Sequence, residues 1–157
     1  MVVKMSFNTD NGGLAVKVTE KIKVSSSESA STWNTRLSQI AYQSGEIFIC
    51  TYSLPDLNYI TRILDKRSTG ITVLANSKFV DKAKELKKLY PNLNIKLAPD
   101  THAKIVLVPP NTVWLSSANF GQSRWFENTI GIKNEKVYEF YINEIKRFIN
   151  GSETVEL

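Results

Sequence analysis

The chain has 157 residues, 42% of them hydrophobic, which is enough for one domain with a substantial core. Its single cysteine, Cys50, excludes an internal disulfide framework, and no run of 18 apolar residues or export signal is visible, so we expect a soluble cytoplasmic protein with no membrane partner. Twenty lysines and arginines against fifteen acidic residues leave a net charge of +5, which favours a polyanionic partner, nucleic acid first.

The first part of the chain carries β signals. Apolar and polar residues alternate over 14–24, the period of a half-buried strand, after turn residues at 8–13. Residues 2–7 could pair with that strand as a hairpin. Three roles for residues 1–25 stay open: an edge hairpin, a dimer arm, or part of a substrate groove.

Strands and helices alternate through the middle of the chain. Helical spacing of apolar residues, capping residues and stop signals predict the helices, and unbroken apolar runs predict buried strands. In chain order we expect a helix over 32–45, a strand at 46–52, a helix that Pro55 opens and residues 68–70 end, a strand at 71–75 and a helix over 77–90.

The second half is rich in strands. Short apolar runs predict strands at 94–97, 104–108, 112–116 and 129–132, with Pro109, Pro110 and Asn111 as the turn between the second and third. A last helix over 135–149 and a loose tail at 152–157 follow. This order predicts an α/β fold for one domain, residues 1–157: a mixed β-sheet flanked by helices on both faces.

The only histidine, His102, stands two residues before Lys104 at the start of a predicted strand. Side chains two residues apart in an extended segment point the same way. Ser117 and Asn119 share this spacing at the end of the next strand, and the short turn makes the two strands antiparallel neighbours. We therefore expect all four side chains to meet in one pocket. A cation with hydroxyl and amide donors suits phosphate oxygens, and imidazole is a competent nucleophile at phosphorus.

Each of these residues also has a structural interpretation when taken alone. His102 could cap the strand, Lys104 could extend into solvent, and Asn119 could form a turn. The spacing of all these residues along the sequence favours a functional site over these separate structural roles. This spacing resembles the His-x-Lys-x4-Asp-x6-Gly-Ser-x-Asn (HKD) motif of the phospholipase D superfamily, especially that of its small bacterial endonucleases, without insertion or deletion. Pro109 stands at the aspartate position and Ser116 at the glycine position.

The resemblance implies a phospholipase D-like α/β/α sandwich and a metal-independent phosphodiesterase, with a nonspecific endonuclease as the expected activity. Because family members use two motif copies and this chain has one, the implied site is shared across a homodimer. One His102 would form a phosphohistidine while the partner's His102 acts as general acid. Glu127 would orient the imidazole, and Lys104, Asn119 and Ser117 would hold phosphate oxygens.

The substrate contacts are less specific in the sequence. Arg124 and Trp125 could touch phosphate and base at the rim, although Trp125 fits a core position equally well, and Ser116 could narrow the pocket. We expect DNA ahead of RNA as the partner, and no cofactor or metal, since one histidine and one cysteine make no zinc cluster. Two other functions stay open: a phospholipase D-type lipid phosphodiesterase, and a catalytically degenerate dimer that binds nucleic acid or protein.

Overall fold

The computed structural model describes residues 14–27, 40, 42–121, 123 and 125–156. The strands are β1 (Leu14–Thr19), β2 (Ile22–Ser27), β3 (Ile47–Cys50), β4 (Ile71–Asn76), β5 (Asn94–Ala98), β6 (Ile105–Val108), β7 (Thr112–Ser116), β8 (Glu127–Lys133) and β9 (Glu153–Thr154). The helices are α3 (Leu57–Leu64), the 3₁₀ turn η1 (Ser77–Phe79), α4 (Val80–Leu89) and α5 (Glu135–Asn150).

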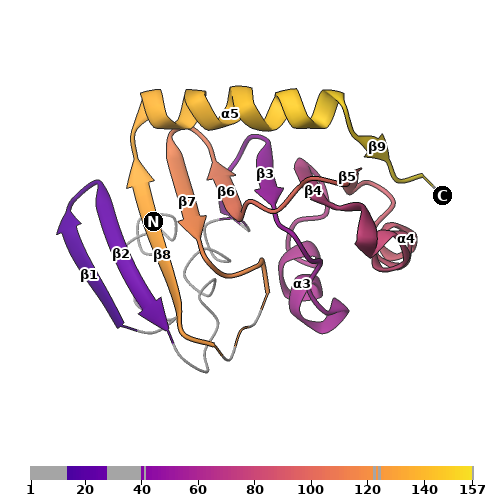
Figure 1. The fold of residues 1–157 in the computed structure, drawn as a ribbon, viewed down its shortest axis with the longest axis horizontal. Helices are drawn as coiled ribbons and strands as arrows, with labels where there is room; N and C mark the ends of the chain where they lie inside the picture. Colours follow the sequence, from indigo (N-terminus) through magenta and orange to yellow (C-terminus); the bar gives the residue numbers. More distant parts are fainter. Residues whose placement is uncertain (1–13, 28–39, 41, 122, 124, 157) are drawn as a thin grey trace.

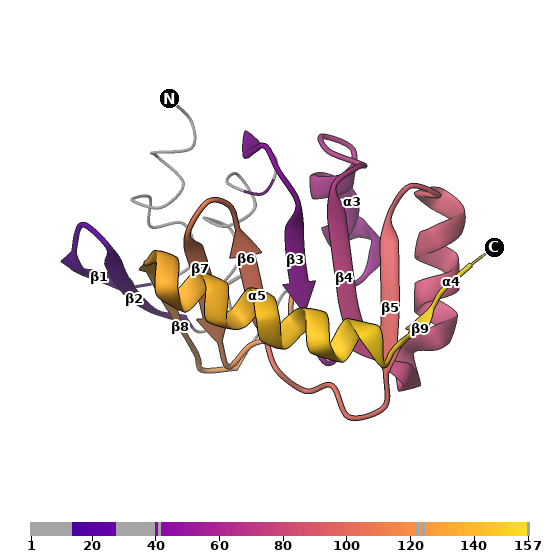
Figure 2. The same cartoon turned by 90° about the horizontal axis from the view of Figure 1, so that it is seen from above.

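The strands form one mixed sheet in the order β1-β2-β8-β7-β6-β3-β4-β5-β9. Strands β3, β4 and β5 are parallel, and every other neighbouring pair is antiparallel. Helix α5 covers one face of this sheet, while α3 and α4 lie on the other (Figure 1). Seen from above, α5 crosses the strands from the β8 side to the β5 side (Figure 2). The predicted α/β class, with helices on both faces of a mixed sheet, is confirmed.

The sheet separates two apolar clusters, because successive side chains of a strand face opposite sides. In β3, Ile47 and Ile49 belong to the cluster under α3 and α4, whereas Phe48 and Cys50 belong to the cluster under α5. Both faces of β3 are therefore covered, as its unbroken apolar run predicts. Burial of Cys50 raises the pKa of its thiol to about 12, which agrees with a packing role.

The predicted strand over 14–24 is wrong in one respect: the structure divides it into the hairpin β1–β2. Glu20 and Lys21 form the turn, where the Lys21 backbone N–H donates to Thr19 Oγ1 at 3.1 Å. This turn has no glycine, proline or asparagine to mark it, so the apolar alternation hides it. The expected pairing segment 2–7 lies outside the described residues, as does most of the expected helix over 32–45.

The predicted loose tail at 152–157 is also wrong. Its strand β9 pairs antiparallel with β5, and the Val155 backbone N–H donates to the Ile95 carbonyl at 3.0 Å. The Val155 side chain is only 6% exposed and packs into the cluster under α3 and α4. One buried valine and backbone pairing with β5 order a segment that shows no periodicity.

The predicted helices that begin at Pro55, at residue 77 and at residue 135 are present, with small changes at their ends. Helix α5 starts after Asn134, whose side-chain oxygen accepts from the Val137 N–H at 3.1 Å, an N-cap that satisfies an otherwise unpaired donor. Ile145 of this helix is fully buried against the sheet, while Phe148 is exposed. In the described part of the chain, no helix has the length and hydrophobicity needed to span a bilayer.

Candidate active site

Four chain segments meet at one end of the sheet. Lys104 directly precedes β6, Ser117 directly follows β7, and Glu127 begins β8. The antiparallel registers place these positions together, since Ile105 pairs with Leu115 and Ser116 pairs with Thr129. The end of β3 joins them because it pairs with the start of β6. The sheet topology thus brings the expected polar side chains to one edge.

His102 and Lys104 face the same way, as their spacing predicts. The Lys104 Nζ atom lies 3.1 Å from Nδ1 and 3.5 Å from Nε2 of His102. Because an ammonium group can only donate, the ring nitrogen that it contacts accepts through its lone pair. The imidazole also packs against the ring of Tyr52, with centroids 5.0 Å apart, and Tyr52 packs edge-on against Phe79 at 5.3 Å. Two aromatic rings, those of Tyr52 and Phe79, therefore support the exposed histidine.

Asn119 joins the end of β7 to the end of β3. Its Oδ1 atom accepts from the backbone N–H groups of Tyr52 and Ser53, at 3.2 and 3.4 Å. The adjacent Phe120 N–H donates to Thr51 Oγ1 at 3.0 Å. These contacts identify Oδ1 as the acceptor end of the amide, which makes Nδ2 the donor end.

The Glu127 carboxylate is held by two serines. The Ser117 hydroxyl donates to Oε2, and the Ser123 hydroxyl donates to Oε1 at 3.3 Å. The Asn128 N–H in turn donates to Ser117 Oγ at 3.0 Å. The expected contact of Glu127 with the imidazole is not among the contacts of the described residues, where His102 instead meets Lys104 and Tyr52. The orienting role of Glu127 stays a prediction.

Electrostatics tune Lys104. Partial burial lowers the pKa of its ammonium group, and the negative charge of Glu127 works in the opposite direction. A lysine of this kind is less strongly hydrated than a surface lysine and is better placed to bind an anion. Within the described part of the chain, no three histidine, cysteine or acidic side chains group into a candidate metal site.

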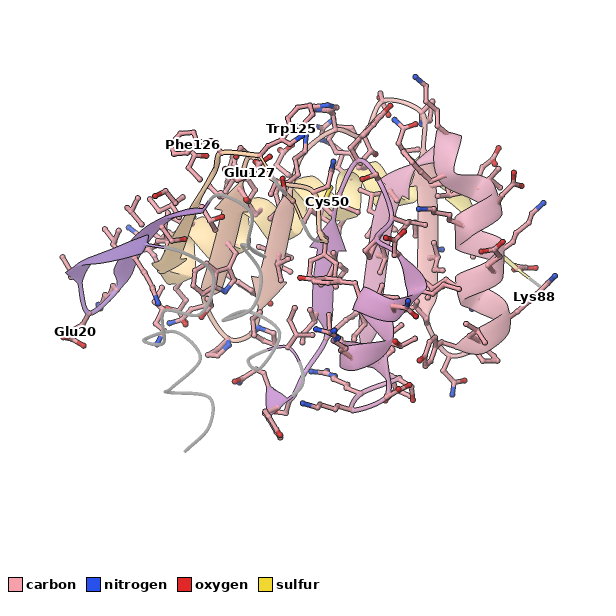
Figure 3. All side chains as sticks on the ribbon, turned by 90° about the horizontal axis from the view of Figure 1, so that it is seen from below. Glu20, Cys50, Lys88, Trp125, Phe126 and Glu127 are labelled. Atoms are coloured by element: carbon pink, nitrogen blue, oxygen red, sulfur yellow. The ribbon has the colours of Figure 1, made fainter. Side chains whose placement is uncertain are left out.

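An open cavity of about 1310 Å³ adjoins these groups. Lys104, Ser117, Asn119 and Glu127 line it on the side of the sheet edge, and His102 borders it through its contact with Lys104. Helices α3 and α4 contribute the opposite wall, and the rim carries two aromatic residues. Figure 3 shows these two, Trp125 and Phe126, beside Glu127 along one edge of the molecule. The remaining charged residues of the lining are Asp56, Arg62, Lys82 and Glu85.

The other predicted residues lie as follows. Trp125 is 79% exposed, which excludes the core alternative for it. Ser116 is outside the cavity lining, because its hydroxyl faces the Asn128 carbonyl at 3.0 Å and Thr129 Oγ1 at 2.8 Å. Arg124 lies outside the described residues.

Pro109, which replaces the aspartate of the family motif, lies at the far end of β6 from Lys104. The two positions are five residue steps apart along an extended chain, a span of about 17 Å. Pro109 is therefore remote from Lys104, and it is not among the residues that line the cavity described above.

Sequence reasoning missed several residues of the site. Thr51 and Tyr52 close the end of β3, while Ser123 and Phe126 shape the loop before β8. One signal could have found the first pair: they follow the carboxyl end of a buried strand with a parallel neighbour, where α/β sheets commonly bind ligands. No comparable signal marks the loop residues.

No protein-family model matches the chain, and no curated protein sequence matches it. Solved structures do match. Nuc from Salmonella typhimurium, a phospholipase D family member, aligns with a TM-score of 0.74 over 87% of this chain and 98% of its own, at 17% identity. NucT from Helicobacter pylori gives a TM-score of 0.64 over 84% and 98%, at 16% identity. This chain has the phospholipase D fold.

The phospholipase D fold thus extends over nearly the whole length of both neighbours. A further structure, the archaeal chromatin protein TrmBL2, described as showing a novel mode of DNA binding, aligns with a TM-score of 0.64 at 11% identity. It covers 87% of this chain and 54% of TrmBL2. At these identities the likeness establishes the fold alone.

Proposed function

We propose that the chain is a metal-independent phosphodiesterase that cleaves nucleic acid nonspecifically as an endonuclease. The observation that carries the proposal is the His102–Lys104 pair, 3.1 Å apart, beside Ser117, Asn119 and Glu127 at one sheet edge. The phospholipase D fold and the net charge of +5 support it. Because a chain holds one histidine, the site is completed by a second copy.

The first chemical step forms a phosphohistidine. A substrate phosphate accepts the hydrogen bond of the Lys104 ammonium group in place of His102. The ring nitrogen of His102 is then free to react. The lone pair of one His102 ring nitrogen attacks phosphorus, and the P–O bond to the leaving strand breaks. The leaving oxygen keeps that electron pair and takes a proton from His102 of the partner subunit, which acts as general acid.

The second step returns the enzyme to its starting state. A water molecule attacks phosphorus while His102 of the partner subunit accepts one of its protons. The P–N bond breaks, and its electron pair returns to the first imidazole. The overall change is hydrolysis of one P–O bond with both histidines restored.

The neighbouring groups stabilise charge on the phosphate. Lys104, the Asn119 amide and the Ser117 hydroxyl are donors that suit the non-bridging oxygens, and losing one such donor typically costs about 10²- to 10³-fold in rate. Glu127 would turn from the serine contacts to the imidazole N–H of His102, which fixes the ring tautomer.

Cleavage assays in excess EDTA test the proposal on supercoiled and single-stranded DNA. Wild type should cut at least one of the two substrates. The rate of cleavage should fall at least about 100-fold in His102→Ala and in Lys104→Ala. Lys82→Ala is the matched control, because Lys82 lines the same cavity but pairs with Asp56 at 3.4 Å. Equal cleavage by wild type and His102→Ala would place the activity elsewhere. Hydrolysis of phosphatidylcholine vesicles with no effect on DNA would select the lipid enzyme.

The degenerate alternative rests on the two departures from the family motif and on the DNA-binding description of TrmBL2. Both departures lie outside the cavity, since Pro109 is at the opposite end of β6 and the Ser116 hydroxyl faces β8. Their positions therefore favour catalysis. Retained DNA binding without any cleavage by wild type would reverse this choice.

A further inference from the structure

Two neighbouring aromatic side chains are left in solvent at the rim of the cavity. Trp125 is 79% exposed and Phe126 is 73% exposed, more than any other large hydrophobic side chains in the described part of the chain. Both line the cavity together with Lys104 and Glu127. Figure 3 shows the two rings beside Glu127. Large rings in water forgo the free energy of burial, so an exposed pair beside a polar site indicates a binding surface.

The loop that carries the rings is tied to the site. The Trp125 N–H donates to Ser123 Oγ at 3.2 Å, and the Ser123 hydroxyl donates to Glu127 Oε1 at 3.3 Å. Two peptide steps separate Trp125 from Glu127, so their Cα atoms are at most about 7.6 Å apart. The rings are therefore presented next to the position where the phosphate is expected.

The chemistry of the cavity identifies the occupant. Arg62 and Lys104 supply cations that suit a phosphate backbone, whereas Lys82 is paired with Asp56, and the two rings supply flat apolar surfaces that suit base faces. In a duplex the base faces are stacked on one another and only the base edges are accessible. We infer that Trp125 and Phe126 form a stacking platform for unpaired bases, so that the cavity receives a single-stranded segment. The inference rests on the proposed function and names its substrate class.

Binding measurements test the platform without depending on cleavage. Fluorescence anisotropy of labelled strands with His102→Ala protein in EDTA would compare a single strand, an abasic strand of the same length and a duplex. The single strand should bind best. Adding Trp125→Ala or Phe126→Ala should weaken single-strand binding about 5- to 100-fold, with little effect on the abasic strand, and Trp125→Phe should restore part of the loss.

Phe140→Ala is the matched control. Phe140 is 57% exposed and lies on α5, across the sheet from the cavity, so its removal should leave all three affinities unchanged. Equal losses for the single and abasic strands, or a preference for duplex, would overturn the platform. So would sedimentation showing that Trp125→Ala dissociates a dimer while the ratio of single-strand to abasic affinity stays constant.

The two proposals fail separately. Ring-dependent binding of single strands by a wild-type protein that cleaves no nucleic acid would keep the platform and remove the phosphodiesterase. Cleavage that requires His102 but is unaffected by Trp125→Ala and Phe126→Ala would keep the phosphodiesterase and remove the platform.

Discussion

Lys104 supplies the positive charge beside His102. It donates to His102 in the free protein, and in the proposed mechanism it holds the phosphate instead. Only the protonated ammonium group can do either. Burial lowers the pKa of Lys104, and the negative charge of Glu127 opposes that shift, so both act on its protonation.

The pH profile of DNA binding should show this, measured in a His102→Ala background so that cleavage and the general acid do not contribute. Binding should fall on the alkaline side below the ordinary lysine pKa of about 10.4, because the deprotonated amine no longer binds phosphate. When Glu127→Gln is added, the alkaline limb should move to lower pH, because a charge that favours the protonated form of Lys104 is gone. Lys104→Arg should remove the limb, since guanidinium stays protonated.

Asp56→Asn serves as the control for that profile. Asp56 also lines the cavity, but it pairs with Lys82 and is not among the causes of the Lys104 shift. Its alkaline limb should coincide with that of His102→Ala alone. An unchanged limb in Glu127→Gln would mean that another group controls the profile.

Sequence spacing predicted part of this local chemistry. The shared direction of His102 and Lys104 follows from the period of an extended segment, and the structure confirms it. The partners of Asn119 could not be predicted, because they lie 66 and 67 residues earlier, at the end of β3. Local spacing determines direction, while tertiary packing determines partners.

Gly131 shows how two strands determine each other's side chains. In the antiparallel pair β7–β8, Gly131 lies opposite Trp114, whose indole is 1% exposed and covers the glycine. A Cβ atom added at position 131 would lie 2.3 Å from the Trp114 ring. The strand therefore tolerates no side chain there without moving a buried indole.

Gly131→Ala should consequently destabilise the fold by about 1–3 kcal/mol, the usual cost of overpacking a core. Urea unfolding followed by circular dichroism would measure it. Gly151→Ala is the control, because the nearest atom to its added Cβ would be 3.9 Å away. Equal midpoints for the two variants would show that the indole shifts at little cost.

Predictability also differs among the elements. Strands β3 to β7 were predicted within two residues at each end, because apolar runs and turn residues mark them locally. The hairpin β1–β2 was predicted as one strand, since its turn lacks marker residues. Strand β9 was missed because its two residues are ordered by β5, not by a pattern of their own.

The molecule as a whole carries half of the proposed reaction centre. With one histidine per chain, nucleophile and general acid have to come from two copies. Sedimentation should therefore show a dimer at the concentrations used for assay. A protein that is fully active as a monomer would contradict the shared site.

Mixing experiments sharpen this expectation. If wild type is equilibrated with an equal amount of His102→Ala, random pairing leaves about a quarter of the dimers with two histidines, so total activity per wild-type chain falls to about half. A self-sufficient subunit would instead keep its full activity per wild-type chain. Phe140→Ala, a surface variant distant from the cavity, provides the mixing control.

The overall architecture was predictable because element order and motif register agree. The order of strands in the sheet was not, since it depends on contacts far apart in the chain. Strand β2 pairs with β8, so that Ile22 lies opposite Ile132, more than a hundred residues away. No local pattern in the sequence indicates this pairing. Which strands lie side by side is decided by packing of the whole chain.

Strand β9 has one more consequence, for solubility. It covers part of the outer edge of β5, whose backbone groups would otherwise be open to pair with any extended chain. A protein cut after Gly151 would expose that edge and lose the buried Val155. Such a truncation would favour edge-to-edge aggregation. The resulting aggregates would have no defined stoichiometry, which distinguishes them from the proposed dimer.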